Sequence, residues 1–293
     1  MASTAALKRS NLFDLTDRVA VVTGGGSGIG LMAAQALAAN GAKVYICGRT
    51  QEKLQNASDK HEAQAAGQLI PVTADISSKA GILALVQEIE RREAYVCLLV
   101  NAAGISSTSG PVAEAGSAPA LRAALFDADG STFDEWADVY RTNVASLFFN
   151  TAAFLPLLQQ STDRHAGWSA AVINITSISG LVKTAQHHFA YNTSKAAAEH
   201  LTRMLAAEIA AAGLKIRVNS IAPGVFPSEM TAKEESDDRQ KSHLPKEKME
   251  EIPAQRPGRD EDMAQAVLFA AANQYLNGQR VVVDGGFTLS AGM

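Results

Sequence analysis

The strongest constraint on the fold is an alternation, repeated along the chain, between short apolar runs and longer alanine-rich stretches with helical spacing. The runs rich in β-branched residues lie at residues 18–23, 43–47, 69–73, 96–100, 170–175, 216–221 and 280–284. They are apolar at nearly every position, as is typical of parallel strands that helices cover on both faces. Strands that alternate with helices build βαβ units. The sequence therefore predicts an α/β fold with a doubly wound, seven-stranded parallel sheet.

Composition indicates one globular domain that acts on a small molecule. The chain has 293 residues, 47% of them hydrophobic, without a flexible linker or a repeat of fixed period, so we expect a single domain over residues 1–293. A net charge of −4 leaves no basic excess for nucleic acid or an anionic membrane surface. No apolar stretch of about 18 residues supports a membrane span.

The beginning of the chain shows no clear targeting pattern. Its first dozen residues are rich in Ser, Thr, Lys and Arg and contain no acid, but they lack the amphipathic pattern of a transit peptide. We therefore expect a flexible segment over residues 1–17 and a cytoplasmic protein. The cysteines, Cys47 and Cys97, each lie inside an apolar run and are expected to be buried free thiols.

Two stretches interrupt the alternation and are candidates for the substrate side of a site. Residues 105–132 are rich in Ser, Gly, Ala and Pro, and form either a loop near the site or an external excursion. Residues 225–257 carry a charge run flanked by apolar side chains, which is typical of either a solvated helix or a mobile lid. The position of this second stretch after the sixth strand favours a substrate lid.

A glycine-rich turn joins the first predicted strand to a long helix, and it reads Thr23-Gly-Gly-Gly-Ser-Gly-Ile-Gly30. Glycines let the backbone approach a ligand, and the exposed N–H groups of a helix start favour an anion. The alternative is a plain tight turn. A strand, a glycine turn and a helix in this order favour a Rossmann-type dinucleotide site. The predicted contacts are Gly24, Ser27, Gly28, Ile29 and Gly30.

The end of the second strand indicates which dinucleotide binds. In NAD-binding proteins an acid about 20 residues past the glycine turn accepts the ribose hydroxyls, whereas an arginine holds a 2′-phosphate. This chain has Gly48 and Arg49 there and no carboxylate. A guanidinium suits bidentate pairing with phosphate. The pattern favours NADP(H) over NAD(H), with a surface arginine at a helix start as the alternative interpretation of Arg49.

A tyrosine and a lysine are spaced to act together. Tyr191 and Lys195 are four residues apart in a predicted helix, so they lie on one face. A nearby ammonium stabilises phenolate and would lower the pKa of the tyrosine from about 10. Ser177 follows the strand at residues 170–175, at the edge where open α/β sheets bind ligands. We therefore expect Ser177 and Tyr191 to converge.

These motifs, in this order, resemble those of the short-chain dehydrogenase/reductase family over almost the whole chain. The matching residues are Thr23-Gly-x-x-x-Gly-x-Gly30, Asn101-Ala-Ala-Gly104, Asn143, Ser177, Tyr191-x-x-x-Lys195 and Pro223-Gly224. The resemblance implies an oxidoreductase that moves a hydride between NADP(H) and a carbonyl or secondary alcohol. It also implies a homotetramer that contacts through helices near residues 144–158 and 191–212, with the C-terminal strand as a second interface.

The resemblance further implies four catalytic residues. Tyr191 would be the acid/base, and Ser177 would donate a hydrogen bond to the substrate oxygen. Lys195 would hold the nicotinamide ribose and lower the pKa of Tyr191, while Asn143 would position a water that relays protons to Lys195. Tyr191 and Lys195 thus also count among the cofactor contacts.

Other cofactor contacts follow from the same resemblance. Asp75 would contact adenine, Asn101 would stabilise the central sheet, and Pro223 and Gly224 would lie beside the nicotinamide. The remaining predicted contacts are Ile76, Ala102, Gly104 and Phe226.

The chain departs from the family pattern in two places. Ala102 replaces a second asparagine and removes one polar contact, and the connection from Gly104 to Asn143 is longer than usual. Residues 223–231 and 284–287 resemble β-ketoacyl reductases of the rhamnolipid type, which favours a 3-oxoacyl or other apolar ketone. The alternatives are a polyol, sugar or steroid dehydrogenase of the same family, or a non-catalytic NADP-binding regulator. We predict no metal site, because the adjacent histidines at residues 187–188 point opposite ways on an extended segment.

Overall fold

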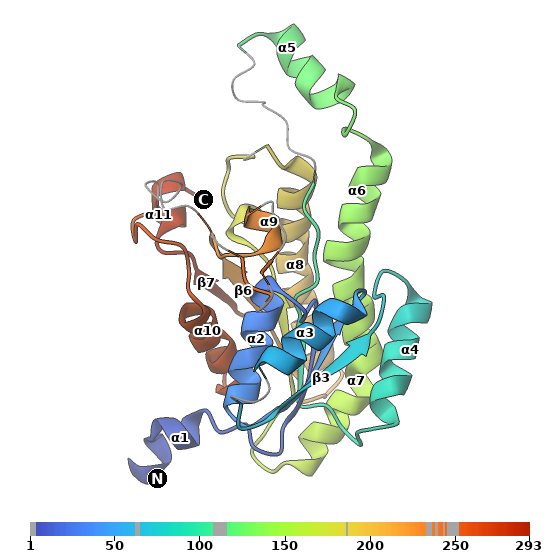
Figure 1. The fold of residues 1–293 in the computed structure, drawn as a ribbon, viewed down its shortest axis with the longest axis vertical. Coiled ribbons are helices and arrows are strands. Elements are labelled where there is room, and N and C mark those ends of the chain that lie inside the picture. Colours follow the sequence, from blue (N-terminus) through green and yellow to red (C-terminus); the bar gives the residue numbers. More distant parts are fainter. Residues whose placement is uncertain are drawn as a thin grey trace.

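The fold is known from a computed structural model. It describes residues 4–61, 65–107, 116–185, 187–232, 236–237, 240–242, 244 and 252–293. The described chain forms one parallel sheet with helices on both sides (Figure 1).

The sheet has seven strands in the order β3-β2-β1-β4-β5-β6-β7, all paired in parallel. The strands are β1 (Val19–Thr23), β2 (Lys43–Gly48), β3 (Gln68–Thr73), β4 (Leu98–Asn101), β5 (Ala171–Ile175), β6 (Arg217–Pro223) and β7 (Arg280–Val283). Each lies within two residues of a predicted run, so the predicted fold class is confirmed. The strand order reverses between β1 and β4, and a crevice opens at such a point in open α/β sheets.

Helices connect the strands. The α-helices are α1 (Arg9–Leu12), α2 (Gly28–Ala39), α3 (Gln51–His61), α4 (Lys79–Glu90), α5 (Ala118–Arg122), α6 (Phe133–Tyr140), α7 (Ser146–Arg164), α8 (Phe189–Ala211), α9 (Glu229–Ala232), α10 (Asp260–Ala272) and α11 (Phe287–Ala291). Short 3-10 turns are η1 (Thr4–Leu7) and η5 (Ile178–Gly180), and π-helical turns are η3 (Ala123–Asp127) and η4 (Arg141–Ala145).

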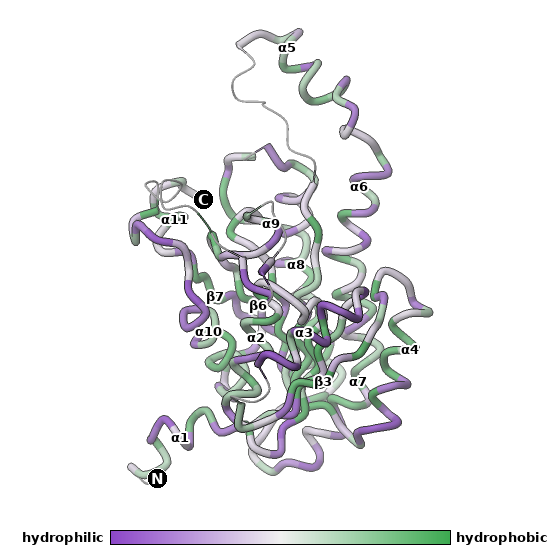
Figure 2. Tube along the Cα trace, viewed as in Figure 1, coloured by the Kyte–Doolittle hydropathy of each residue, from purple (hydrophilic) through white to green (hydrophobic). Residues whose placement is uncertain are grey.

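Alternate residues of the strands build two separate core layers. Ala20 and Val22 of β1 pack with α2, α3 and α10, whereas Val19 and Val21 pack on the other face with α4, α7 and α8. Successive side chains of a strand point to opposite faces, so a strand apolar at every position can serve both layers. The apolar residues accordingly concentrate around the sheet in Figure 2. Both cysteines are buried and free, as predicted.

The first residues are partly held by the core. Leu15 is fully buried, and its N–H donates to the Asn40 carbonyl at 2.9 Å. Helix α1 instead extends from the body (Figure 1) and has no buried residue. The predicted segment 1–17 therefore includes one residue with a structural role.

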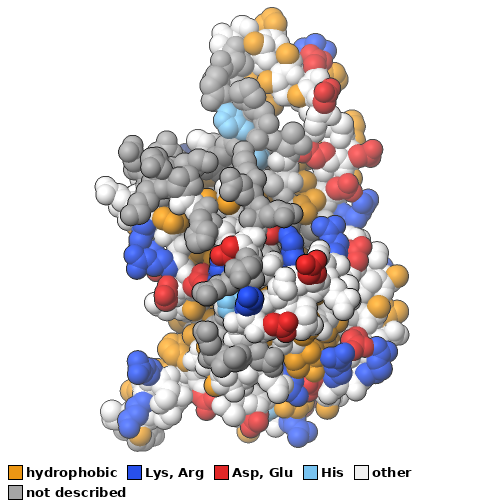
Figure 3. All heavy atoms as spheres, viewed as in Figure 1, with side chains coloured by type: hydrophobic (Ala, Val, Ile, Leu, Met, Phe, Trp, Pro, Cys, Tyr) orange, Lys and Arg blue, Asp and Glu red, His pale blue; other side chains and the backbone are white. Residues whose placement is uncertain are grey.

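The connection after β4 includes an external excursion, one of the two predicted alternatives. Helix α5, η3 and the start of α6 form an arm that projects beyond the body, while the end of α6 packs along α8 (Figures 1 and 3). The arm exposes large apolar side chains, namely Leu121, Leu125, Phe126, Phe133 and Trp136. Residues 108–115 lie outside the described part of the chain. None of the described helices is long and apolar enough to cross a membrane.

Candidate active site

The glycine turn wraps the start of α2 so tightly that side chains would not fit. Gly24 has φ +67°, and a Cβ there would lie 2.8 Å from the backbone of Ala103. A Cβ on Gly30 would lie 2.1 Å from the Gly24 carbonyl oxygen. Such close approach of backbone to backbone leaves the first N–H groups of α2 open toward a ligand.

A cavity of about 570 Å³ lies at this turn, which is within the usual range for ligand sites. Twelve of the predicted cofactor residues line it: Gly24, Ser27, Gly28, Ile29, Gly30, Arg49, Asp75, Ile76, Ala102, Gly104, Tyr191 and Lys195. They come from the ends of β1, β2, β3 and β4, from the start of α2 and from α8, so the carboxyl edge of the sheet brings them together.

Ser177 and Tyr191 meet at the same edge. Ser177 follows β5, is 8% exposed, and accepts a hydrogen bond from the Ser179 N–H at 3.1 Å. Tyr191 lies in the first turn of α8 and is half-buried. Burial raises the pKa of Tyr191, while the hydrogen bond with Ser177 opposes the rise. The predicted lowering by Lys195 is therefore not what this structure gives: the Lys195 Nζ lies 5.6 Å from the centre of the tyrosine ring, and burial dominates.

Lys195 is a buried cation one helical turn from Tyr191. It is 6% exposed, and its Nζ donates to the Ile175 carbonyl at 3.0 Å. Burial lowers the pKa of Lys195 to about 8, while the Glu199 carboxylate raises it. The ammonium is therefore close to its titration point at neutral pH, which suits a group that passes protons.

Glu199 is a buried acid, one turn further along α8. It is 5% exposed and accepts hydrogen bonds from Thr176 Oγ1 and, at 2.8 Å, from Ser220 Oγ. Two hydroxyl donors from neighbouring strands thus hold a negative charge beneath Lys195. The sequence analysis did not single out this residue.

Asn143 lies in the π-helical turn η4, between α6 and α7. Its Oδ1 accepts from the Ile105 N–H at 2.9 Å, and its Nδ2 donates to the Ile105 carbonyl at 2.9 Å and to Ser194 Oγ at 3.0 Å. A Cβ on Gly104 would lie 3.2 Å from Asn143 Oδ1 and 3.5 Å from Lys195 Nζ. Asn143 and Lys195 therefore approach the same point from two sides. π-helical turns of this kind are frequent at functional sites.

Comparison with known proteins gives a consistent result. The model of the short chain dehydrogenase family matches residues 18–239. The short-chain dehydrogenase/reductase PhomF of Diaporthe leptostromiformis is 40% identical over 97% of this chain and 95% of its own length. The rhamnolipids biosynthesis 3-oxoacyl-(acyl-carrier-protein) reductase of Pseudomonas aeruginosa is 38% identical over 94% of this chain and 98% of its own. The chain belongs to the short-chain dehydrogenase family.

A solved structure agrees with this assignment. The Pseudomonas aeruginosa RhlG/NADP active-site complex is similar to this dehydrogenase with a TM-score of 0.78 at 36% identity, covering 94% of this chain and 98% of that chain. The predicted family resemblance is confirmed. The protein is an oxidoreductase that acts on a small molecule.

Some predicted contacts of the dehydrogenase do not line the cavity. Phe226 is 2% exposed, packs in the core, and lines a separate cavity of about 140 Å³ together with Gly258. Its side chain is therefore part of the core, and the predicted cofactor contact at Phe226 stays a prediction. Pro223 is buried in β6, and Gly224 packs against Asp284 after β7, so neither reaches the cavity wall.

Asn101 also lies outside the cavity wall. It is 1% exposed, and its Nδ2 donates to Asn174 Oδ1 at 2.9 Å. Asn174 Nδ2 in turn donates to Thr202 Oγ1 at 2.9 Å. This chain of amides joins β4, β5 and α8 beneath the site.

The dehydrogenase cavity includes residues that sequence reasoning missed. Lys53 of α3, Arg141 of η4, and Ser228 and Glu229 near the start of α9 line it. Lys53 lies four positions after Arg49 in the sequence, and this proximity was a usable signal. Ser228 and Glu229 lie in the predicted lid segment 225–257, but nothing in the sequence pointed to these two residues or to Arg141 individually.

The histidine pair has other partners. His188 Nδ1 is 3.1 Å from the Ser107 carbonyl oxygen. Within the described ranges, no three His, Cys, Asp or Glu side chains are grouped so that they could hold a metal ion.

Proposed function

We propose that this dehydrogenase reduces an apolar ketone, such as a 3-oxoacyl compound, with NADPH. The observation that carries the proposal is that Tyr191 and Lys195 line a cavity that begins at the glycine turn, while Ser177 forms a hydrogen bond with Tyr191. When bound, the nicotinamide cofactor supplies the hydride. The relative that is 38% identical is named as a 3-oxoacyl reductase, which supports this class of substrate.

The residues at the glycine turn fit a dinucleotide. Ser27 precedes α2, and Gly28 and Gly30 leave the start of this helix open to an anion. Asp75 and Ile76 line the cavity after β3, where adenine would lie. Lys195 would hold the nicotinamide ribose, and Asn143 would position a water near its ammonium.

Arg49 supports NADP(H) as the cofactor. It follows β2, lines the cavity, and is exposed, so its guanidinium is free to meet a 2′-phosphate. A Cβ at Gly48 would make only ordinary contact with Leu54 at 3.5 Å, so the position is open and carries no acid. The similar RhlG structure is a complex with NADP.

Tyr191 would supply the proton for reduction. In this proposal its hydroxyl gives a proton to the substrate oxygen, and Ser177 donates a hydrogen bond to the same oxygen. The raised pKa of Tyr191 keeps it protonated at neutral pH, as an acid must be for reduction. Lys195 would then return a proton to Tyr191.

The segment after β6 would act as a lid over the substrate. Ser228, Glu229 and Met230 line the cavity, and Met230 is 39% exposed. Methionine adapts to apolar ligands of varied shape. Amide hydrogen exchange at α9 is expected to fall when NADP and a substrate analogue bind; equal exchange in both states would reject the lid.

A substrate screen tests the reaction. NADPH oxidation would be followed with 3-oxoacyl thioesters, cyclic diketones, keto sugars and steroid ketones, using the Tyr191→Phe variant as the inactive control. We expect the highest kcat/KM with an apolar ketone. Preference for a keto sugar would reject the proposed substrate class while leaving the reaction type intact.

We also propose a homotetramer. Phe148 of α7 and Met204 of α8 are 43% and 51% exposed, and Val282 of β7 is 38% exposed. These apolar side chains lie on the elements that the family resemblance assigns to the two interfaces. Light scattering at micromolar concentration should give about four times the chain mass of 30.8 kDa, and a monomer would contradict the proposal.

A further inference from the structure

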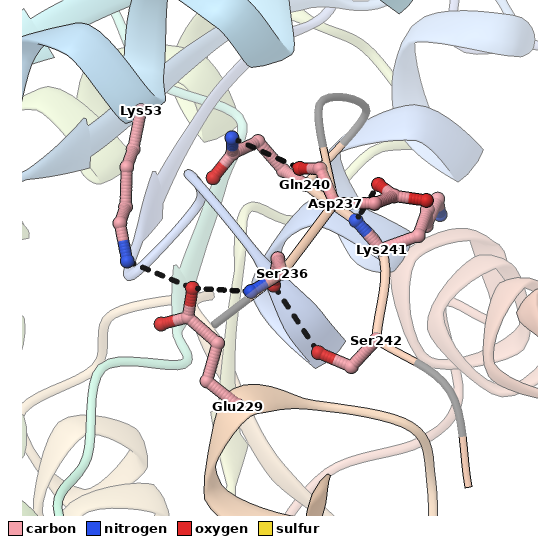
Figure 4. A network of polar contacts seen from close by, with 7 residues as sticks. All are labelled: Lys53, Glu229, Ser236, Asp237, Gln240, Lys241 and Ser242. Atoms are coloured by element: carbon pink, nitrogen blue, oxygen red, sulfur yellow. Dashed lines mark hydrogen bonds and ion pairs between the residues drawn. The ribbon is translucent and has the colours of Figure 1, made fainter. Parts of the chain in front are cut away.

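An ion pair crosses the cavity between two elements that are far apart in the sequence. Lys53 Nζ of α3 lies 2.7 Å from Glu229 Oε1, the first residue of α9, although 176 positions separate them (Figure 4). Both residues line the cavity. The two side chains are 36% and 31% exposed, so the pair lies at the rim and can be reached by a ligand.

Lys53 belongs to the part of the cavity that faces the end of β2. It follows Arg49 by four positions, and Arg49, Thr50 and Lys53 all line this cavity. Arg49 and Lys53 therefore bring two cations to the same cavity. A phosphate dianion, which carries about −1.5 to −2 charges and three acceptor oxygens, is a better partner for two cations than one carboxylate is.

Glu229 is held beside Lys53 by its own segment. Ser228 and Thr231 exchange hydrogen bonds at the start of α9, with Ser228 N to Thr231 Oγ1 at 2.9 Å and Thr231 N to Ser228 Oγ at 3.2 Å. A Cβ on Gly28 would lie 3.0 Å from the Ser228 Cβ, so α9 begins directly against the glycine turn. Glu229 thus has a fixed place at the cofactor end of the cavity.

Further contacts join the same segment to α2 and α10. The Ser236 N–H donates to Glu229 Oε1 at 3.3 Å, and Ser236 Oγ lies 3.1 Å from Ser242 Oγ (Figure 4). Lys241 Nζ reaches Gln35 Oε1 of α2 at 2.8 Å and Asp260 Oδ2 of α10 at 2.5 Å. These anchors do not involve Lys53, so Glu229 can lose its lysine partner while its segment stays attached.

We propose that Lys53 is a specificity-determining residue of the cofactor site, shared between Glu229 and the 2′-phosphate of the cofactor. A cofactor with the 2′-phosphate takes Lys53 away from Glu229, and a cofactor without it leaves the ion pair in place. Glu229 therefore competes with the 2′-phosphate for Lys53. This competition reduces the affinity that the phosphate adds to cofactor binding. This inference rests on the proposed use of NADP(H).

Charge explains why the exchange is favourable. Burial raises the pKa of Glu229, but Lys53 and Ser236 lower it below its ordinary value, so Glu229 is an anion at neutral pH. Exposed ion pairs contribute little to stability, typically about 0–1 kcal/mol. A rim carboxylate is consequently displaced at small cost, and Ser236 still donates to it afterward.

The experiment compares two ligands that differ only in the phosphate. Adenosine 2′,5′-bisphosphate and 5′-AMP would each be titrated by calorimetry into the full-length protein. The same titrations would be made with four variants, namely Lys53→Met, Glu229→Gln, the double variant of these two, and Arg49→Ala. Lys53→Arg is the charge-preserving control. Glu52→Gln removes an exposed acid next to Lys53 on α3 and matches the charge change of Glu229→Gln. Thermal melts check that each variant is folded.

We expect Lys53→Met to weaken adenosine 2′,5′-bisphosphate binding about tenfold, because it removes a charge-assisted hydrogen bond to the 2′-phosphate. Binding of 5′-AMP, which lacks this phosphate, should weaken less than about twofold. Glu229→Gln should strengthen the bisphosphate about threefold or more, with 5′-AMP unchanged and Glu52→Gln near the parent. In the Lys53→Met background, Glu229→Gln should have no effect.

Two results would overturn the inference. The first is unchanged or weaker bisphosphate binding in Glu229→Gln, and the second is an equal gain in the Lys53→Met background, which would mean a general charge effect. Failure of the cofactor proposal has a separate signature, because the parent protein would then bind both ligands equally and Arg49→Ala would change neither. A parent that prefers the bisphosphate through Arg49, with no response at Glu229, rejects only the role of Lys53 and Glu229.

Discussion

The two sides of the cavity are built by different means. On the side of β1 and α2, the wall is backbone, because Gly24, Gly28 and Gly30 approach neighbouring chain too closely for side chains. Elsewhere in the cavity, Ile105 and Met230 bring side chains from the long segments that follow β4 and β6. Backbone shape is set by a few adjacent residues, whereas a side-chain wall depends on where a distant segment packs.

This difference indicates how the two ligands are recognised. The glycine wall offers N–H groups and a helix start, which suit the phosphates common to all dinucleotides. The side-chain wall offers apolar groups whose identity can change without disturbing the sheet. The cofactor side is therefore expected to be sensitive to single changes, and the substrate side more tolerant of them. The following predictions test that contrast, from the largest effect to the smallest.

Tyr191→Phe should reduce turnover by at least about a hundredfold, because it removes the proton donor with little change in shape. NADP binding and the melting temperature should stay near those of the parent. Steady-state kinetics and cofactor titration measure both quantities. Tyr275, which is fully exposed, provides the matched Tyr275→Phe control. Turnover within threefold of the parent would reject Tyr191 as the acid.

Arg49→Ala should weaken NADPH binding by a factor of about ten to a hundred, because a phosphate-paired guanidinium is lost. NADH binding should hardly change. Fluorescence titration of both cofactors measures the difference, with Arg122→Ala on the exposed arm as the control. Parent protein that prefers NADH would show that the end of β2 does not select for phosphate.

Glu199→Gln should move the alkaline limb of the kcat/KM profile to lower pH by about one unit. Burial lowers the pKa of Lys195 to about 8 and Glu199 raises it, so loss of the carboxylate lowers the pKa further. Lys195 then loses its proton at a lower pH, and activity falls earlier as pH rises. The amide oxygen can still accept from Ser220 Oγ, and the NH2 group can donate to Thr176 Oγ1. The control is Glu208→Gln, a change at an exposed position of the same helix, which should leave the alkaline limb in place. If the limb does not move in Glu199→Gln, Glu199 does not raise the pKa of Lys195.

Met230→Ala should raise KM for an apolar ketone about threefold and leave NADPH affinity and the melting temperature unchanged. The loss of part of one thioether side chain, already 39% exposed, removes only some apolar contact. Met204→Ala on α8, where the side chain is 51% exposed, is the matched control. A large loss of cofactor binding in Met230→Ala would mean that the two sides are not separable.

Much of the fold could be predicted because its signals are local. Each strand of the sheet matches a largely apolar run such as residues 96–100, and alternate residues of strands such as β1 feed two cores. The glycine turn could be recognised for the same reason, since its conformation depends on adjacent residues alone. The spacing of Tyr191 and Lys195 needed only the period of a helix.

The features that the sequence could not reveal depended on tertiary packing. Phe226 follows the family motif but packs against Gly258, 32 positions later, and is drawn into the core. The pKa of Tyr191 rises because surrounding elements bury it, an effect that the spacing to Lys195 could not reveal. The use of Lys53 by Glu229 likewise depends on where α9 packs.

The sequence by itself determined the sheet, the phosphate-binding turn and the pairing of Tyr191 with Lys195, because each of these is encoded within a few neighbouring residues. The tertiary structure alone decided which side chains line the rest of the cavity, which acid lies beneath Lys195, and which carboxylate meets Lys53. The physical reason is that burial and charge act through space. Their effect on a residue is set by the elements that the fold brings against it, and no spacing along the chain records that arrangement.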